Sequence, residues 1–123
     1  IIREGDAGYI VSYGEMLYSC LDVVENLKKE GINVGLINKS TLNVVDTDAL
    51  NIAGKTPFVL VVESQNTKTG LGSRYGTWLL EQGLAPRYAH IGTSLEGRGG
   101  LGEQVTYQGC DPAGIRKKVD SLL

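Results

Sequence analysis

The chain has 123 residues, 41% of them hydrophobic and 21% charged, which is the size and composition of a single soluble domain. Twelve Lys and Arg against fourteen Asp and Glu give a formal net charge of −2. A protein that binds nucleic acid or an anionic membrane would need a basic face instead. No hydrophobic run approaches the roughly 18 residues of a membrane span. The chain starts at Ile1 without a methionine, and we expect it to be part of a larger protein.

The first third of the chain predicts a strand, a helix and a second strand. Residues 9–13 have the pattern of a short strand that stops at Gly14. In residues 16–29 hydrophobic side chains recur at the spacing of one helix face; they are Leu17, Cys20, Leu21, Val24 and Leu27. Gly31 is the expected left-handed end of this helix, and residues 33–38 form the next predicted strand. About 20 residues between the strands indicate a parallel pair with a right-handed crossover.

The middle of the chain predicts a short helix followed by a fully buried strand. Asp46 or Thr47 is expected to cap a helix over residues 48–52, which Gly54 closes. Residues 58–62 are hydrophobic without alternation, which indicates that both faces of this strand are covered.

The last part of the chain adds two helices and one strand. A helix is predicted over residues 73–82, with Gly83 at its end, and a weaker strand over residues 87–91. Asp111 is the expected N-cap of the last helix and Pro112 lies in its first turn. Strands that alternate with helices predict a three-layer α/β/α fold.

The two cysteines and the histidine do not suggest a built site. Cys20 lies on the hydrophobic helix face, so we expect a small buried side chain. A nucleophilic thiolate at Cys110 would require a His or Lys beside it. A single histidine, His90, cannot form a multi-histidine metal site, and we expect it to be structural or solvated. Two cysteines are too few for a disulfide framework, which favours a reducing, cytoplasmic compartment.

Two glycine-rich segments of the sequence are candidates for phosphate binding. Residues 97–102 match G-x-G-x-x-G, but no buried strand leads directly into them, so we interpret them as a surface loop. Gly70 and Gly72 lie between the buried strand and the helix after it. Backbone N–H groups there favour an anion, with Ser73 as N-cap and Arg74 assisting. The alternative is that the glycines only allow the turn and helix to pack closely on the sheet.

Glu63 ends the buried strand, where α/β proteins place functional groups. It is equally consistent with a solvated strand end or with a partner for a lysine. The sequence has no G-x-S-x-G elbow, no Walker motif and no acidic cluster with metal-ligand spacing. We therefore predict no catalytic residue, cofactor site or metal site within this chain.

The order of these pieces resembles the C-terminal domain of the transketolase superfamily of thiamine-diphosphate enzymes. The resemblance rests on five segments of the sequence: residues 12–14 (Ser-Tyr-Gly), 30–34 (Glu-Gly-Ile-Asn-Val), 37–46, 61–63 (Val-Val-Glu) and 70–73 (Gly-Leu-Gly-Ser). Residues 109–115 are similar to the turn before the last helix in transketolases and 1-deoxyxylulose-5-phosphate synthase. The chain departs from the family near Val45, where proline is common, and in the glycine-rich residues 92–107.

The resemblance implies a five-stranded, mostly parallel sheet with an antiparallel first strand, of which residues 1–4 would be the remnant. It implies that preceding domains, or a preceding subunit, hold thiamine diphosphate and magnesium across a homodimer interface. The C-terminal domain would be structural and would support the dimer. The expected strand order places residues 9–13 beside residues 58–63. Gly14 and the segment from Glu63 through Gly70, Gly72, Ser73 and Arg74 would then border a crevice, the candidate anion site.

Trp78, Leu79 and Leu80 are adjacent on one predicted helix and cannot all face one core, which predicts an exposed apolar patch. With His90 they are the candidate interface. The parent reaction implied is the transfer of a two-carbon ketol unit between sugar phosphates. One alternative is the equivalent domain of a 2-oxoacid–ferredoxin oxidoreductase or a 2-oxo acid dehydrogenase beta subunit. Another is a free-standing, flavodoxin-like anion-binding module.

Overall fold

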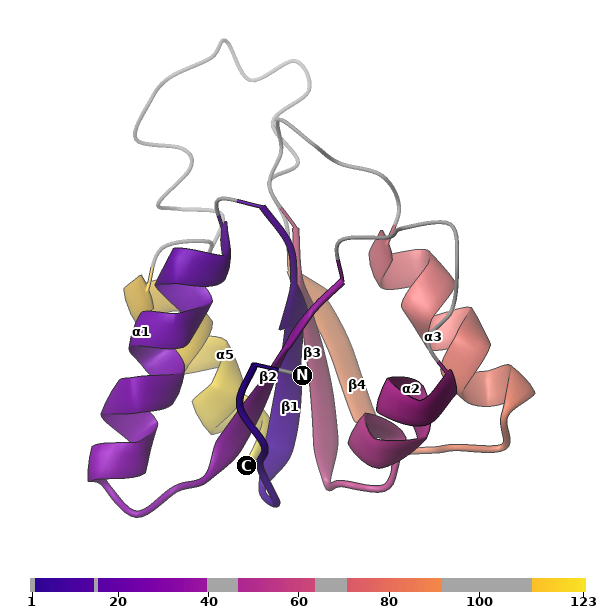
Figure 1. Cartoon of the computed structure of the whole chain (residues 1–123), viewed down its shortest axis with the longest axis horizontal. Coiled ribbons are helices and arrows are strands. Elements are labelled where there is room, and N and C mark those ends of the chain that lie inside the picture. Colours follow the sequence, from indigo (N-terminus) through magenta and orange to yellow (C-terminus); the bar gives the residue numbers. More distant parts are fainter. Residues whose placement is uncertain (1, 15, 40–46, 64–70, 92–111) are drawn as a thin grey trace, which may run out of the picture.

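The computed structural model describes residues 2–14, 16–39, 47–63, 71–91 and 112–123. Four parallel strands form a sheet in the order β2-β1-β3-β4; they are β1 (Gly8–Ser12), β2 (Val34–Asn38), β3 (Phe58–Val62) and β4 (Arg87–Ile91). In Figure 1, α1 (Met16–Lys29) and α5 (Pro112–Leu122) lie on one side of the sheet, and α2 (Thr47–Gly54) and α3 (Leu71–Glu81) on the other. The predicted three-layer α/β/α fold is therefore confirmed.

The predicted fifth strand is not confirmed among the described residues. The expected antiparallel first strand is represented there by one isolated bridge between Arg3 and Leu36. The Leu36 N–H donates to the Arg3 carbonyl at 2.9 Å. The chain then turns across the start of β2, where the N–H groups of Asp6 and Ala7 both donate to the Asn33 carbonyl at 3.0 Å. This turn separates the bridge at Arg3 from the start of β1 at Gly8.

The other predicted bounds agree with the structure to within a few residues. The helix over 16–29 and the strands over 58–62 and 87–91 match α1, β3 and β4 at both ends. β1 begins at Gly8, β2 begins at Val34 and α2 extends over Thr47–Gly54. α3 begins at Leu71 instead of Ser73. Asp46 and Asp111, the expected caps of α2 and α5, lie outside the described residues.

Glycines in the left-handed region end α1 and α3, as predicted. Gly31 has φ +82° and Gly83 has φ +72°. After α1 the Ile32 N–H donates to the Leu27 carbonyl at 3.0 Å, and after α3 the Leu84 N–H donates to the Leu79 carbonyl at 2.9 Å. Each bond spans the glycine in the manner of a Schellman motif, which satisfies carbonyls that the helix itself leaves open.

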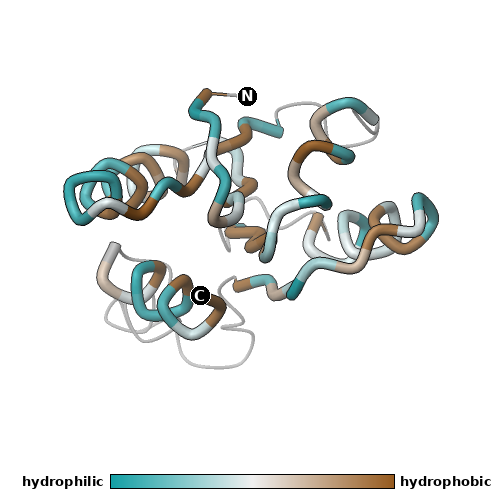
Figure 2. Tube along the Cα trace, turned by 90° about the horizontal axis from the view of Figure 1, so that it is seen from below, coloured by the Kyte–Doolittle hydropathy of each residue, from teal (hydrophilic) through white to brown (hydrophobic). Residues whose placement is uncertain are grey.

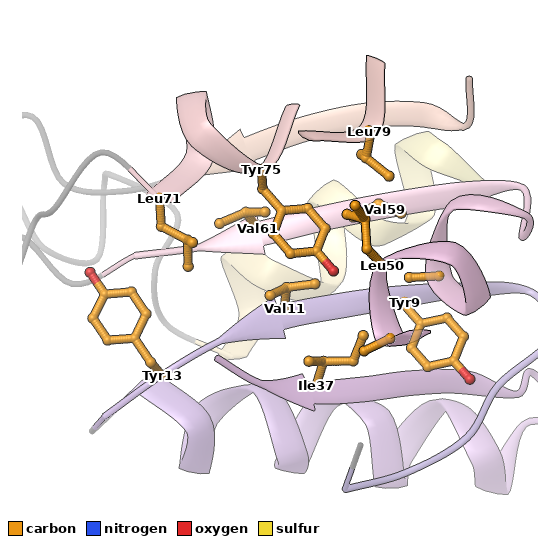
Figure 3. Close-up of a cluster of buried hydrophobic side chains, with 12 residues drawn as sticks. Tyr9, Val11, Tyr13, Ile37, Leu50, Val59, Val61, Leu71, Tyr75 and Leu79 are labelled. Carbon is orange, nitrogen blue, oxygen red and sulfur yellow. The ribbon is translucent and has the colours of Figure 1, made fainter. Parts of the chain in front are cut away.

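The hydrophobic core has two parts, one on each face of the sheet. Every residue of β3 is buried, which confirms that helices cover both of its faces. Cys20 is also buried, as predicted, within the part beneath α1 and α5. Figure 3 shows the other part, where Tyr75 of α3 lies over Val61 and Val59 and near Leu50 of α2. The turned view in Figure 2 shows hydrophobic positions gathered in the middle layer and hydrophilic ones on the outer turns of the helices.

None of the described helices is both long enough and apolar enough to cross a membrane.

Candidate functional site

The carboxyl ends of β1 and β3 meet at the edge of the sheet at the top of Figure 1. The two strands pair directly, with Val11 opposite Val61. The helix after β1 packs on one face and the helix after β3 on the opposite face. The predicted neighbourhood of these two strands is therefore confirmed. Such a reversal point is where open α/β sheets place their ligands.

A buried hydrogen bond joins the carboxyl ends of β1 and β3. The Ser12 hydroxyl, fully buried, donates to the Val62 carbonyl at 2.8 Å. Gly14 follows with φ +62°, is exposed, and its carbonyl accepts the Leu17 N–H at 3.1 Å. An L side chain rarely adopts this backbone conformation, which favours glycine at the turn from β1 to α1.

Glu63 is neither a solvated strand end nor an exposed charge. Its side chain is 5% exposed, and its carboxylate caps α3. The Leu71 N–H donates to Oε1 at 3.2 Å and the Gly72 N–H to Oε2 at 3.0 Å. The Tyr13 hydroxyl points to Oε1 at 3.5 Å, and Figure 3 shows Tyr13 and Leu71 at the same end of the core. A carboxylate at a helix N-terminus is favoured by the helix dipole and satisfies N–H groups that have no partner within the helix.

This cap corrects the prediction for Ser73. Because α3 begins at Leu71, Ser73 lies inside its first turn, where its carbonyl accepts the Thr77 hydroxyl at 3.0 Å. Ser73 and Arg74 are both exposed. Gly70 lies outside the described residues. The N–H groups assigned to an anion are thus bonded to a side chain of the protein itself.

The glycines of α3 allow close packing against β4. A Cβ at Gly72 would come within 2.5 Å of the His90 ring, and one at Gly76 within 3.0 Å of the Tyr88 ring. The Tyr88 hydroxyl also donates to the Gly72 carbonyl. Burial raises the pKa of Tyr88 above its ordinary value, and the nearby Tyr75 and Glu63 raise it further. The geometry supports the alternative in which these glycines serve packing.

Lys39 is a buried charge that the sequence interpretation missed. It follows β2 directly, is 6% exposed, and its N–H donates to the Ser12 carbonyl at 2.8 Å. Its ammonium lies 5.7 Å from the centre of the Trp78 ring, within the range of a cation–π interaction. Its position in the sequence could have indicated this, because Lys39 directly follows a predicted strand and so lies at the same edge of the sheet as Glu63.

The candidate interface residues differ in how far they are exposed. Leu80 is 75% exposed, whereas Leu79, predicted to share its surface, is 2% exposed and belongs to the core. Trp78 is partly buried and makes an edge contact with Tyr75, with ring centres 5.9 Å apart. His90 is exposed on β4. The surface contributed by this set is therefore Leu80, His90 and part of Trp78.

Leu80 and His90 line a groove of about 790 Å³ between α3 and β4. Its floor and rim include Leu84, Tyr88 and the polar Ser73. Among the described residues no three His, Cys, Asp or Glu side chains gather as metal ligands. Most of the residues that line the groove are apolar, and Ser73 adds a polar group.

Comparisons with known proteins agree on one family. The model of the family described as "Transketolase, C-terminal domain" matches residues 1–115. The chain is 30% identical to 1-deoxy-D-xylulose-5-phosphate synthase of Dehalococcoides mccartyi over 128 residues, covering 100% of the chain and 20% of the synthase. It is 30% identical to the beta subunit of the pyruvate dehydrogenase E1 component of Staphylococcus epidermidis over 90 residues, covering 72% of the chain and 28% of that subunit.

A solved structure shares the fold. The chain superposes on the "Split gene transketolase, inactive beta4 tetramer" with a TM-score of 0.82 and 24% identity, over 98% of this chain and 40% of that one. The chain thus spans between a fifth and two fifths of the length of these three proteins.

Proposed function

Because this chain belongs to the family of transketolase C-terminal domains, we propose that residues 1–123 form the C-terminal domain of a larger thiamine-diphosphate enzyme. In this proposal the domain has a structural role, supports a homodimer and binds no cofactor of its own. The observation that carries the proposal is the family match over residues 1–115. The short coverage of the relatives' own length, 20% for the synthase, is consistent with a piece of a multidomain or multisubunit protein.

The parent reaction in this proposal is the transfer of a two-carbon ketol unit between sugar phosphates. Thiamine diphosphate would supply the nucleophilic carbon and the electron sink, and magnesium would bind its diphosphate. Among the described residues, no three acidic, His or Cys side chains gather as metal ligands. Following the family resemblance, we assign both groups to the preceding domains or subunit, in the cytoplasm, and derive no chemical step within this chain.

Support for the dimer role comes from the surface of α3. Leu80 is 75% exposed beside the groove that α3 forms with β4. A large exposed apolar side chain next to an apolar groove is typical of a surface that another protein surface covers. The name of the structural neighbour records a tetramer of beta chains, which is consistent with assembly through a domain of this fold.

A second candidate is the equivalent domain of a 2-oxo acid dehydrogenase beta subunit. The similarity to the pyruvate dehydrogenase E1 beta subunit, 30% over 72% of this chain, favours it. The two candidates differ in the protein that accompanies the domain. A preceding section with ketol-transfer activity on sugar phosphates supports the first candidate, and oxidative decarboxylation of a 2-oxo acid supports the second.

Calorimetric titration of the 123-residue chain with thiamine diphosphate and magnesium tests the absence of a cofactor site. We expect no heat of binding at micromolar concentrations, because the proposal assigns the diphosphate and its metal to the preceding domains or subunit. The control is the chain combined with the proposed preceding domains or subunit, where binding is expected. Micromolar affinity of the chain alone would contradict the proposal.

A further inference from the structure

The N-terminus of α3 is built like an anion site. α3 has eleven residues, follows β3 at the reversal point of the sheet, and directs the N–H groups of Leu71 and Gly72 at one point. A helix start of this kind commonly receives a phosphate or carboxylate from a ligand. Here the two groups receive the carboxylate of Glu63, at 3.2 Å and 3.0 Å.

Glu63 is held in place by more than its carboxylate. Its own N–H donates to the Ile91 carbonyl at 2.9 Å, which fixes the end of β3 beside the end of β4. The Tyr13 hydroxyl lies 3.5 Å from Oε1. Glu63 is 5% exposed, and its carboxylate cannot leave the helix start without breaking its contacts with Leu71, Gly72 and Tyr13.

The first turn of α3 is also held against β4. The Tyr88 hydroxyl donates to the Gly72 carbonyl, and the His90 ring fills the space beside the Gly72 Cα. The first turn of α3 therefore has little freedom to move away from β3 and β4. A ligand could reach the two N–H groups only by displacing the carboxylate.

We propose that Glu63 is an internal anion that closes the N-terminus of α3 against phosphate and carboxylate ligands. An entering anion would have to break two charge-assisted hydrogen bonds and lie beside the displaced negative charge of Glu63, which repels it. In this proposal, phosphate is excluded from the Leu71 and Gly72 N–H groups, although the helix start is arranged for an anion.

The proposal is tested by removing the internal anion and supplying a free one. Glu63→Ala deletes the four heavy atoms of an acetate ion, so acetate is a matched probe. We expect sodium acetate to raise the Tm of E63A by about 4 °C at concentrations several times its dissociation constant. Sodium chloride at equal ionic strength should not do so. Acetate should leave the Tm of the wild-type chain and of E63Q unchanged, because in both of them a side chain still fills the position.

Glu81→Ala is the control variant, since it removes an exposed carboxylate from the other end of α3. Acetate should not raise its Tm. Equal effects of acetate on E63A and E81A would overturn the proposal, because the rescue would then not depend on the α3 helix start. An absence of any acetate effect on folded E63A would overturn it too.

A second measurement needs no variant. In the wild-type chain, inorganic phosphate is titrated while the amide resonances of Leu71 and Gly72 are followed by NMR. We expect no saturable shift of either resonance at millimolar phosphate. A saturable shift of both would show that a ligand reaches these N–H groups and would overturn the proposal. Neither experiment depends on the parent reaction, so this proposal and the proposed function can fail separately.

Discussion

The imidazole of His90 occupies the space in which a side chain at residue 72 would begin. A Cβ built on Gly72 lies 2.5 Å from Cγ of His90 and 2.7 Å from its Nδ1. Real Cβ atoms do not approach so closely, so one of the two residues would have to move. The contact fixes the first turn of α3 against β4.

We expect Gly72→Ala to destabilise the chain by about 1–3 kcal/mol, as overpacking in a well-filled site does. In an open helix the same change would stabilise by about 1 kcal/mol, so the sign is diagnostic. The free energy of unfolding is measured by chemical denaturation. His90→Ala combined with Gly72→Ala should recover most of the loss. A double variant no more stable than G72A would show that the contact is not the cause.

Ser12→Ala should cost about 1–3 kcal/mol, because it leaves the buried Val62 carbonyl without its hydroxyl partner. Ser121→Ala is the matched control. The Ser121 hydroxyl also donates to a carbonyl, that of Lys118, at 2.6 Å, but at an exposed position. The control should lie within about 0.5 kcal/mol of the wild type. Equal losses in the two variants, measured in denaturant, would contradict the importance of burial at Ser12.

The contact between Lys39 and Trp78 is expected to contribute about 0.5–2 kcal/mol as a cation–π pair. Each single variant, Lys39→Met and Trp78→Leu, also changes packing, so neither measures the pair. A double-mutant cycle removes those contributions. Additive losses, within about 0.3 kcal/mol, would mean that the ammonium and the ring do not interact.

Local signals in the sequence were sufficient for most of the fold. The unbroken hydrophobic run of β3 predicted burial on both faces, and Gly31 and Gly83 predicted the helix ends, because these properties depend on neighbouring residues only. The start of α3 was predicted two residues late. Ser73 is a favourable N-cap residue, but the cap comes from Glu63, eight residues before Leu71.

The position of the candidate site could be predicted from the sequence, but the contacts between its side chains could not. Strand order brings Glu63 to the end of β1, and that order was inferred correctly from the family resemblance. Whether a carboxylate turns to the helix or to solvent depends on side-chain packing, which the sequence pattern does not describe. The approach of Lys39 to Trp78 joins residues far apart in the chain, and only the assembled sheet brings them together.

The ion pair between Arg116 of α5 and Glu30 at the end of α1 should make stability depend on pH. Two hydrogen bonds from the guanidinium, 2.7 Å and 2.8 Å long, hold the pKa of Glu30 below its ordinary value of 4.5. Because the pKa is lower in the folded chain, the pair stabilises above about pH 4.5 and is lost as the pH falls through the folded-state pKa.

We therefore expect Glu30→Gln to lower the Tm slightly at pH 7 and to converge with the wild type in acid. The effect is small because the pair is exposed to solvent and screened by salt. In an Arg116→Gln background, Glu30→Gln should have no further effect at any pH. A constant difference in Tm between E30Q and the wild type from pH 7 to pH 3 would contradict this assignment.

Leu80 provides the test of association through α3. Leu80 is 75% exposed and Tyr18, on α1 at the other face of the sheet, is 80% exposed. Because both side chains are already in solvent, Leu80→Asp and Tyr18→Asp should each leave the Tm of the isolated chain nearly unchanged. If the proposed dimer buries the surface of α3, L80D should weaken self-association at least tenfold in sedimentation equilibrium, since a charge would be buried there without a partner. Y18D should associate like the wild type. Equal association constants for all three chains, or a greater loss in Y18D, would place the dimer contact elsewhere.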